Sequence, residues 1–187
     1  MKKYFIILLL VSNLFAQKIL IPMDQGQTNH LKAYGITYWV LKQGLRVEWL
    51  LNYRGGSFLM DKHEGIINEL RLRGISWEEP AASQLTNMYA TIDENNMDVI
   101  FLEKDAKIAV YTPPNKRPWD DAVTLALTYA EVDYDIIWDE EVLAGKLSEY
   151  DWVHLHHEDF TGQYGKFYAN YRHQDWYKEQ KEKFEAM

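Results

Sequence analysis

The densest group of chemically useful side chains lies near the end of the sequence, in the segment HLHHED at residues 154–159. Imidazole and carboxylate groups together suit a divalent metal such as zinc or iron, and equally a general base that a carboxylate orients. As a metal site the segment would use His154, His156 and Glu158. As a catalytic site it would use His156 or His157 as the base, with Glu158 orienting the ring. The spacing matches no closed metal motif, so a metal cofactor is admitted but not required, and a purely structural role stays open.

Two glycine-containing loops could bind a ligand. The first loop contains Arg54, Gly55 and Gly56. The Arg54 guanidinium could bind a ligand carboxylate through two hydrogen bonds, and the two glycines would let backbone N–H groups approach the same ligand. This loop is not a nucleotide-binding P-loop, because the Gly-Lys-Ser/Thr ending is missing. The second loop, TGQYGK at residues 161–166, could serve as a lid or a ligand cradle, and an ordinary turn is the alternative for both. The candidate ligand-binding residues are Arg54, Gly55, Gly56, Asp159, Gly162, Gln163 and Tyr164.

Composition excludes several classes of protein. The chain has 187 residues, with 20 Lys and Arg against 28 Asp and Glu, for a net charge of −8. This acidic excess argues against a nucleic-acid binder, which needs a basic surface to displace counterions. The absence of cysteine excludes a disulfide scaffold, a thiolate zinc site and a Cys nucleophile within these residues. A small molecule, a sugar or a peptide is the expected kind of partner, and the oligomeric state is open.

The first sixteen residues are typical of a secretory signal. Lys2 and Lys3 precede an unbroken apolar run at residues 5–11, and the small residue Ala16 stands at the expected cleavage point. The run is far shorter than the roughly 20 residues that span a bilayer. We therefore expect a mature chain that starts at Gln17, has no membrane anchor and resides in the periplasm or outside the cell. A short buried N-terminal strand is the alternative.

The hydrophobic pattern predicts an α/β protein with an open, mainly parallel sheet and flanking helices. A strand at 18–23, a helix from the Asn29 cap to Gly44, and a strand at 45–51 predict a βαβ unit, whose strands would be parallel and adjacent. This unit belongs to an N-terminal α/β region, residues 17–104. Its other expected elements are helices at 63–72 and 81–89 and a short strand at 75–77.

A second unit is expected to start near residues 97–102, with the boundary set between residues 104 and 105. Its strands at 107–112, 134–138 and 150–155 alternate with helices, a pattern typical of a doubly wound sheet. Asp120 and Asp121 stand where they would complement the N-terminus of the first of these helices. A charged helix at 175–185 then leads into no further strand, so the sheet of region 105–187 is expected to be incomplete at its C-terminal end.

The sequence resembles a family of exported Bacteroidetes proteins that are often named asparagine synthetase B. The resemblance covers essentially the whole chain and rests on QKILIPMD, HLKAYG, WLLNYRGGSF, KIAVY, WDDAVTLALTYAE and YDWVHLHHEDFTGQYGKF. It implies a class I glutamine-amidotransferase-like (flavodoxin-like) domain, of which residues 105–187 would be the first part. It also implies a longer protein, with a Cys-containing segment and any nucleophile beyond Met187.

The family name does not by itself supply a mechanism. Glutamine-dependent asparagine synthetases use an N-terminal Cys and an ATP-pyrophosphatase domain, whereas this chain has no Cys, begins with an export signal and shows no phosphate-binding signature. We therefore expect that the chain alone is not a synthetase. Three hypotheses stay open: a hydrolase of an amide or related bond when full length, a non-catalytic domain in which Tyr164 and Tyr168 stack on a sugar or peptide, and a metal-binding protein.

Overall fold

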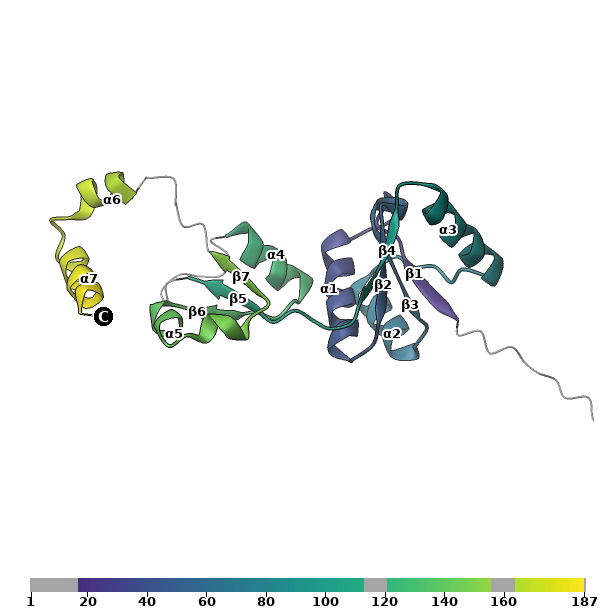
Figure 1. Cartoon of the computed structure of the whole chain (residues 1–187), viewed down its shortest axis with the longest axis horizontal. Helices are drawn as coiled ribbons and strands as arrows, with labels where there is room; N and C mark the ends of the chain where they lie inside the picture. The colour runs from purple at the N-terminus through teal and green to yellow at the C-terminus, as the bar shows by residue number, and fades with distance from the viewer. Residues whose placement is uncertain (1–16, 113–120, 156–163, 187) are drawn as a thin grey trace, which may run out of the picture. The chain divides into compact units, whose positions relative to one another are not determined.

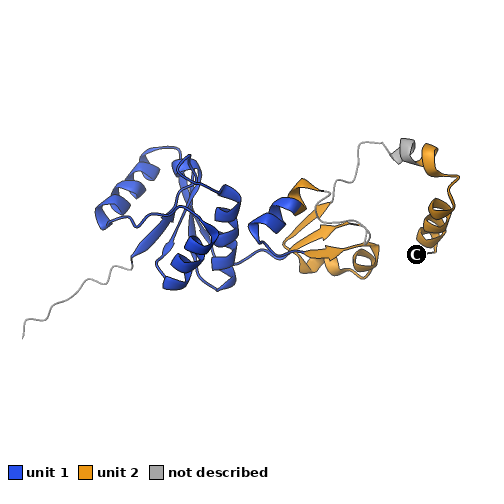
Figure 2. Ribbon diagram, turned by 180° about the vertical axis from the view of Figure 1, so that it is seen from behind, with its two compact units in different colours: residues 1–107, 125–134 blue, residues 108–124, 135–187 orange. Residues whose placement is uncertain are grey.

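The chain was analysed as a computed structural model, which describes residues 17–112, 121–155 and 164–186, with the backbone alone at 164–167 (Figure 1). It divides into two compact units (Figure 2). The first holds residues 1–107 and 125–134, and the second holds residues 108–124 and 135–187. Each unit has its own sheet. No helix in the described ranges is both long enough and apolar enough to cross a membrane.

The sheet of the first unit has four strands in the order β1-β3-β2-β4. They are β1 (Lys18–Ile21), β2 (Val47–Leu51), β3 (Ser57–Asp61) and β4 (Asp98–Leu102). Every neighbouring pair is antiparallel, so the expectation of a mainly parallel sheet is wrong for this unit. The run at 97–102, where the second unit was expected to start, supplies β4 of this first sheet.

The expected adjacency of β1 and β2 is also wrong, because β3 lies between them. Leu59 of β3 pairs with Leu20 on one side, and Met60 pairs with Val47 on the other. A short turn after β2, which includes the 3₁₀ helix η1 (Tyr53–Gly55), lets β3 fold back at once as a hairpin, and this occupies the edge of β2 that β1 would have used. The two strands still run in the same direction, since each is antiparallel to β3.

Three helices cover the two faces of this sheet (Figure 1). Helices α1 (His30–Lys42) and α2 (Glu64–Arg73) pack on one face, and α3 (Ala82–Glu94) packs on the other. The predicted start of α1 is confirmed, because the Asn29 side chain accepts a hydrogen bond from the Lys32 backbone N–H. The strand expected at 75–77 is reduced to a single bridge between Leu20 and Glu78.

The second unit contains a three-stranded parallel sheet in the order β6-β5-β7. The α/β class and the parallel sheet predicted here are confirmed. The strands are β5 (Ile108–Tyr111), β6 (Asp135–Ile137) and β7 (Trp152–Leu155). The helices that follow β5 along the chain are α4 (Ala122–Ala130), α5 (Asp139–Leu143), the 3₁₀ helix η3 (Lys146–Glu149), α6 (Tyr164–Tyr171) and α7 (Asp175–Glu185).

The strand order places a switch point at the carboxyl ends of β5 and β7. The chain leaves the central strand β5, pairs β6 on one side of it, and returns to pair β7 on the other side. In open α/β sheets, ligands bind outside the carboxyl ends of the strands at the point where the strand order reverses. The end of this sheet is therefore the first place to look for a site.

Candidate functional site

Five side chains of different chemistry stand at or just beyond the carboxyl ends of the parallel strands of the second unit. Tyr111 and Thr112 close β5, Trp138 and Asp139 follow β6, and His154 lies one residue before the end of β7. The three strand ends lie at the same end of the sheet because the strands are parallel, although the segments are far apart in sequence. The geometry around His154 is the most developed part of this edge.

His154 faces a carboxylate that is itself fixed by the start of a helix. The ring Nε2 of His154 lies 3.1 Å from Oδ1 of Asp121. The same oxygen accepts the backbone N–H groups of Val123 at 2.7 Å and Thr124 at 3.1 Å, so Asp121 caps the N-terminus of α4. Only 8% of Asp121 is exposed. The carboxylate therefore holds the imidazole in one orientation.

The charge state of Asp121 decides which nitrogen of His154 carries the proton. Burial opposes ionisation, but the N–H groups of Thr124 and Val123 together with the His154 ring lower the pKa of Asp121 below 3.8. An ionised carboxylate only accepts hydrogen bonds, so Nε2 of His154 donates and Nδ1 carries the lone pair when the ring is neutral. No hydrogen bond to Nδ1 is found among the described residues. The ring is thus arranged to accept a proton at Nδ1.

Two further oxygens at this edge are buried without a hydrogen-bond partner in the described part of the chain: Thr112 Oγ1 and Asp139 Oδ2. Thr112 is 5% exposed, and strand alternation places it on the same face of the sheet as His154, whose register partner is Val110. Asp139 Oδ1 accepts the hydroxyl of Tyr111. Because buried polar atoms are normally hydrogen-bonded, these two oxygens are suited to receive donors from a bound molecule.

An aromatic pair lies beside these oxygens. The ring of Tyr111 stacks on Trp138 with a centroid distance of 4.7 Å and an interplanar angle of 22°. On β7, the His154 ring lies 6.2 Å from the ring of Trp152. The edge thus combines a positioned histidine, unpaired oxygens and aromatic surface, which is the usual make-up of a small-molecule site.

Of the site residues predicted from the sequence, His154 is the one that the structure describes at this end of the parallel sheet. Tyr164 begins α6, where the backbone alone is described. The remaining candidates on the loop lie outside the described residues; they are His156, His157, Glu158, Asp159, Gly162 and Gln163. Within the described ranges, no group of three or more His, Cys, Asp or Glu residues could hold a metal ion. Sequence reasoning assigned Asp121 to the helix start alone and missed its pairing with His154.

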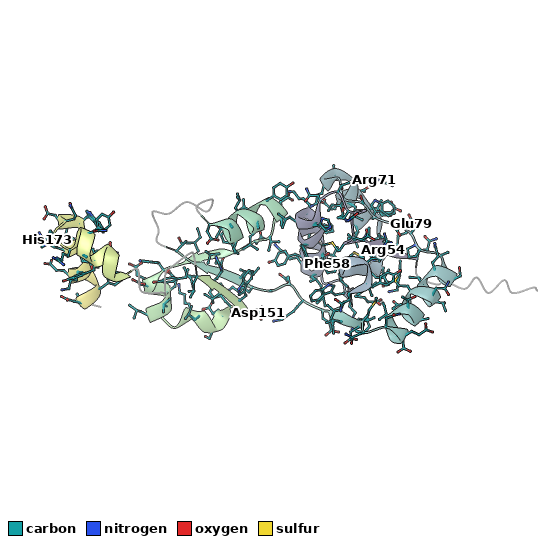
Figure 3. All side chains as sticks on the ribbon, turned by 90° about the horizontal axis from the view of Figure 1, so that it is seen from above. Arg54, Phe58, Arg71, Glu79, Asp151 and His173 are labelled. Atoms are coloured by element: carbon teal, nitrogen blue, oxygen red, sulfur yellow. The ribbon has the colours of Figure 1, made fainter. Side chains whose placement is uncertain are left out.

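In the first unit, Arg54, which Figure 3 labels, pairs with two protein carboxylates. Its Nε donates to Asp24 Oδ2 at 2.6 Å, and its two terminal nitrogens donate to the two oxygens of Glu78 at 2.9 Å each. The hydrogen bonds that Arg54 donates to Glu78, and then the one to Asp24, raise the pKa of the guanidinium. A ligand carboxylate, as the sequence predicted, would have to displace one of these partners. A hollow of about 510 Å³ borders Arg54 and Glu78 and is also lined by Tyr53 and Asn87.

The two glycines after Arg54 form the turn that joins β2 to β3. Gly55 and Gly56 have φ values of 83° and 89°, and Arg54 itself has φ 45° and ψ 49°. A Cβ atom on Gly55 would lie 2.4 Å from the backbone oxygen of Met23. These glycines therefore serve the close approach of two parts of the same unit, and this accounts for their presence without a ligand.

No protein-family model matches this sequence, and no curated protein matches it. Among solved structures, a formyltetrahydrofolate deformylase from Pseudomonas putida KT2440 is 12% identical over 81% of this chain, with a TM-score of 0.20. The chain spans about half of that protein, 53% of its length. A TM-score of this size does not indicate a shared fold.

Proposed function

We propose that the second unit is the first part of an open, flavodoxin-like, amidotransferase-like domain in an exported protein. The strand order β6-β5-β7 supports this, because it corresponds to the order 2-1-3 with which flavodoxin-like sheets begin. The resemblance of its strand and loop segments to the exported family supports it further. Export rests on the signal-like residues 1–16, and the proposed partner is a small molecule rather than a nucleic acid.

The proposed activity is hydrolysis of an amide or a related bond, in a chain long enough to complete the domain. The observation that carries it is the 3.1 Å contact between His154 Nε2 and Asp121 Oδ1 at the switch point. In this scheme Nδ1 of His154 takes the proton of the attacking water or side chain, and Asp121 stabilises the imidazolium that forms. The proton then passes to the leaving amine as the C–N bond breaks. If water is the nucleophile, the acid is released in this step; if a side chain is the nucleophile, a water molecule then hydrolyses the acyl-enzyme to release the acid. His156, His157 and Glu158 remain candidates for the same role.

The second candidate is a non-catalytic binding domain, and aromatic side chains near the C-terminus favour it. Tyr168, Tyr171 and Trp176 on α6 and α7 are 42%, 40% and 48% exposed. Aromatic faces of this kind stack on sugars and on peptide side chains. In this reading the edge of the parallel sheet would hold the ligand without breaking it.

The test is ammonia release from a panel of primary amides, measured for the chain and for a version extended to the length of the resembled family. His154→Gln should reduce kcat/KM by a factor of about 10² to 10⁴, the usual range for loss of a general base. His63→Gln is the matched control, because His63 flanks α2 of the first unit and makes no capping hydrogen bond. Unchanged activity in His154→Gln would overturn the assignment of the base.

The other readings have their own outcomes in the same experiment. Saturable binding of a sugar or peptide by a wild-type chain that hydrolyses none of the amides would favour the binding domain. A rise of the unfolding midpoint with added zinc, lost in His154→Gln, would favour the metal site instead.

A further inference from the structure

The two edges of the sheet in the first unit differ. At the β1 edge, the N–H of Leu20 donates to the carbonyl of Glu78 at 2.9 Å, and the N–H of Glu78 donates back at 2.8 Å. At the other edge, β4 pairs with β2, and no described segment pairs with its outer side. An open row of backbone donors and acceptors is a template for another strand, which proteins usually block with prolines, bulges or charges.

Among the side chains of β4, the Asp98 carboxylate covers one outward donor, the N–H of Val99, and the rest of the strand is apolar. Ile100 is 39% exposed and Phe101 is 55% exposed, and the strand sequence DVIFL contains no proline and no lysine. Register with β2 places Ile100 beside Trp49 on the face covered by α1 and α2, and places Phe101 beside Glu48 on the face covered by α3. Apolar side chains are therefore exposed on both faces of one open edge, which is typical of an interaction surface.

The backbone of β4 fixes which groups point outward. The N–H of Val99 donates to the carboxylate of Asp98 at 2.7 Å rather than across to β2. In an antiparallel ladder, alternate residues bond to the neighbouring strand, so Val99 and Phe101 turn their N–H and C=O groups to the open edge while Ile100 turns toward β2. Outward N–H and C=O groups on every second residue can pair with the backbone of another extended strand.

We propose that the partner strand is β4 of a second copy of this chain, paired antiparallel about a two-fold axis at Ile100. This register places Val99 of each copy opposite Phe101 of the other, and the outward groups of the two residues form two hydrogen bonds when the N–H of Val99 leaves the Asp98 carboxylate. Phe101 then covers Val99, which already packs against the cluster of Leu50 and α3 side chains.

The oligomeric state of the full chain tests the pairing. Sedimentation equilibrium should show a dimer, and Phe101→Pro should be a monomer with unchanged circular dichroism, because that N–H points away from β2 and proline is tolerated on edge strands. Phe101→Lys provides a second variant that keeps the backbone donor and adds a repelling charge. Leu72→Lys is the matched control, since Leu72 on α2 is 80% exposed and lies outside the edge. A monomeric wild type, or a dimer that persists in both Phe101 variants, overturns the pairing.

Cysteine crosslinking tests the register, and the chain has no cysteine of its own. Facing residues of a non-hydrogen-bonded pair have Cα atoms about 4.5 Å apart, within the range that a disulfide bridges. Ile100→Cys should therefore form a disulfide dimer under mild oxidation, while Phe101→Cys and the control Leu72→Cys should not. A crosslink at residue 101 instead of 100, or an equal yield at residue 72, overturns the two-fold axis at Ile100. The pairing involves the first unit alone, so it stands or fails independently of the hydrolase proposal.

Discussion

Replacing Asp121 separates its two roles, as the cap of α4 and as the partner of His154. Asp121→Ala removes the acceptor for the N–H groups of Val123 and Thr124 and for the His154 ring. Loss of an N-cap costs about 1 kcal/mol. Loss of a hydrogen bond to a charged group costs about 1.5–3 kcal/mol, and both partners here are largely buried. The expected total is therefore about 3 kcal/mol of unfolding free energy.

Asp121→Asn distinguishes the cap from the charge. Asparagine caps helices as well as aspartate does, and its amide oxygen can still accept from Nε2 of His154. We expect this variant to lose about 1 kcal/mol, which is the part that depends on ionisation. Asp175→Ala is the control, because Asp175 begins α7 with its side chain 92% exposed, and its loss should change stability by less than about 0.5 kcal/mol.

The stabilisation that Asp121 provides should decrease at acidic pH. The folded protein lowers the pKa of Asp121, so the stabilisation from its ionised form is complete above pH 3.8 and is lost as the pH falls through the lowered value. The stability difference between the wild type and Asp121→Asn should accordingly shrink below pH 3.8.

Amide hydrogen exchange is the assay of choice, because the two units can unfold separately. The N–H groups of Val123 and Thr124 should exchange more than tenfold faster in Asp121→Ala, since 1.4 kcal/mol corresponds to a factor of ten. In Asp121→Asn both should stay protected within a factor of about ten. Equal exchange in the alanine variant and the wild type would refute the capping geometry. An asparagine variant as damaged as the alanine variant would refute the separation of the two roles.

Two further predictions concern the first unit. Gly55→Ala should lower the free energy of unfolding in urea by about 3 kcal/mol, because it combines a positive φ with a clash against the Met23 carbonyl. The control Gly44→Ala, at positive φ in open space, should lower it by about 1 kcal/mol. Equal losses in the two variants would show that the close approach is absent. Burial and then the hydrogen bond to Glu48 raise the pKa of Tyr89 above 10.0, so this pair stabilises the fold fully below pH 10.0 and less as the pH rises through the raised value. Glu48→Gln should move the ultraviolet titration of the Tyr89 phenol part of the way back toward 10.0, and an unchanged titration would contradict the contact.

Local signals in the sequence predicted the elements well where neighbouring residues decide the conformation. Asn29 caps α1 as expected, and the helix expected at 63–72 is α2, which ends before Gly74 at φ 66°. The strand of residues 57–61 was missed, because Ser57, Phe58, Leu59 and Met60 are all buried and a strand buried on both faces lacks the alternation that marks a half-exposed one.

Strand neighbours were decided by the tertiary structure. The sequence predicted β1 beside β2, but the short turn at Gly55 and Gly56 brings β3 back first. A hairpin closes a short loop and a crossover closes a long one, so the hairpin costs less conformational entropy. The parallel direction of β5, β6 and β7 was predicted correctly, because strands that alternate with helices are joined by crossovers, while their order was seen only in the structure.

The sequence by itself determined which residue types are present and where most helices and strands lie: an acidic, cysteine-free α/β chain with a signal-like start and histidines at the end of its last predicted strand. It could not show that His154 meets Asp121, which lies 33 residues earlier, rather than its own neighbours. That pairing exists because β7 inserts beside β5, so its carboxyl end meets the start of the helix that follows β5. Contacts of this kind depend on which strand edges pair, and only the complete fold sets them.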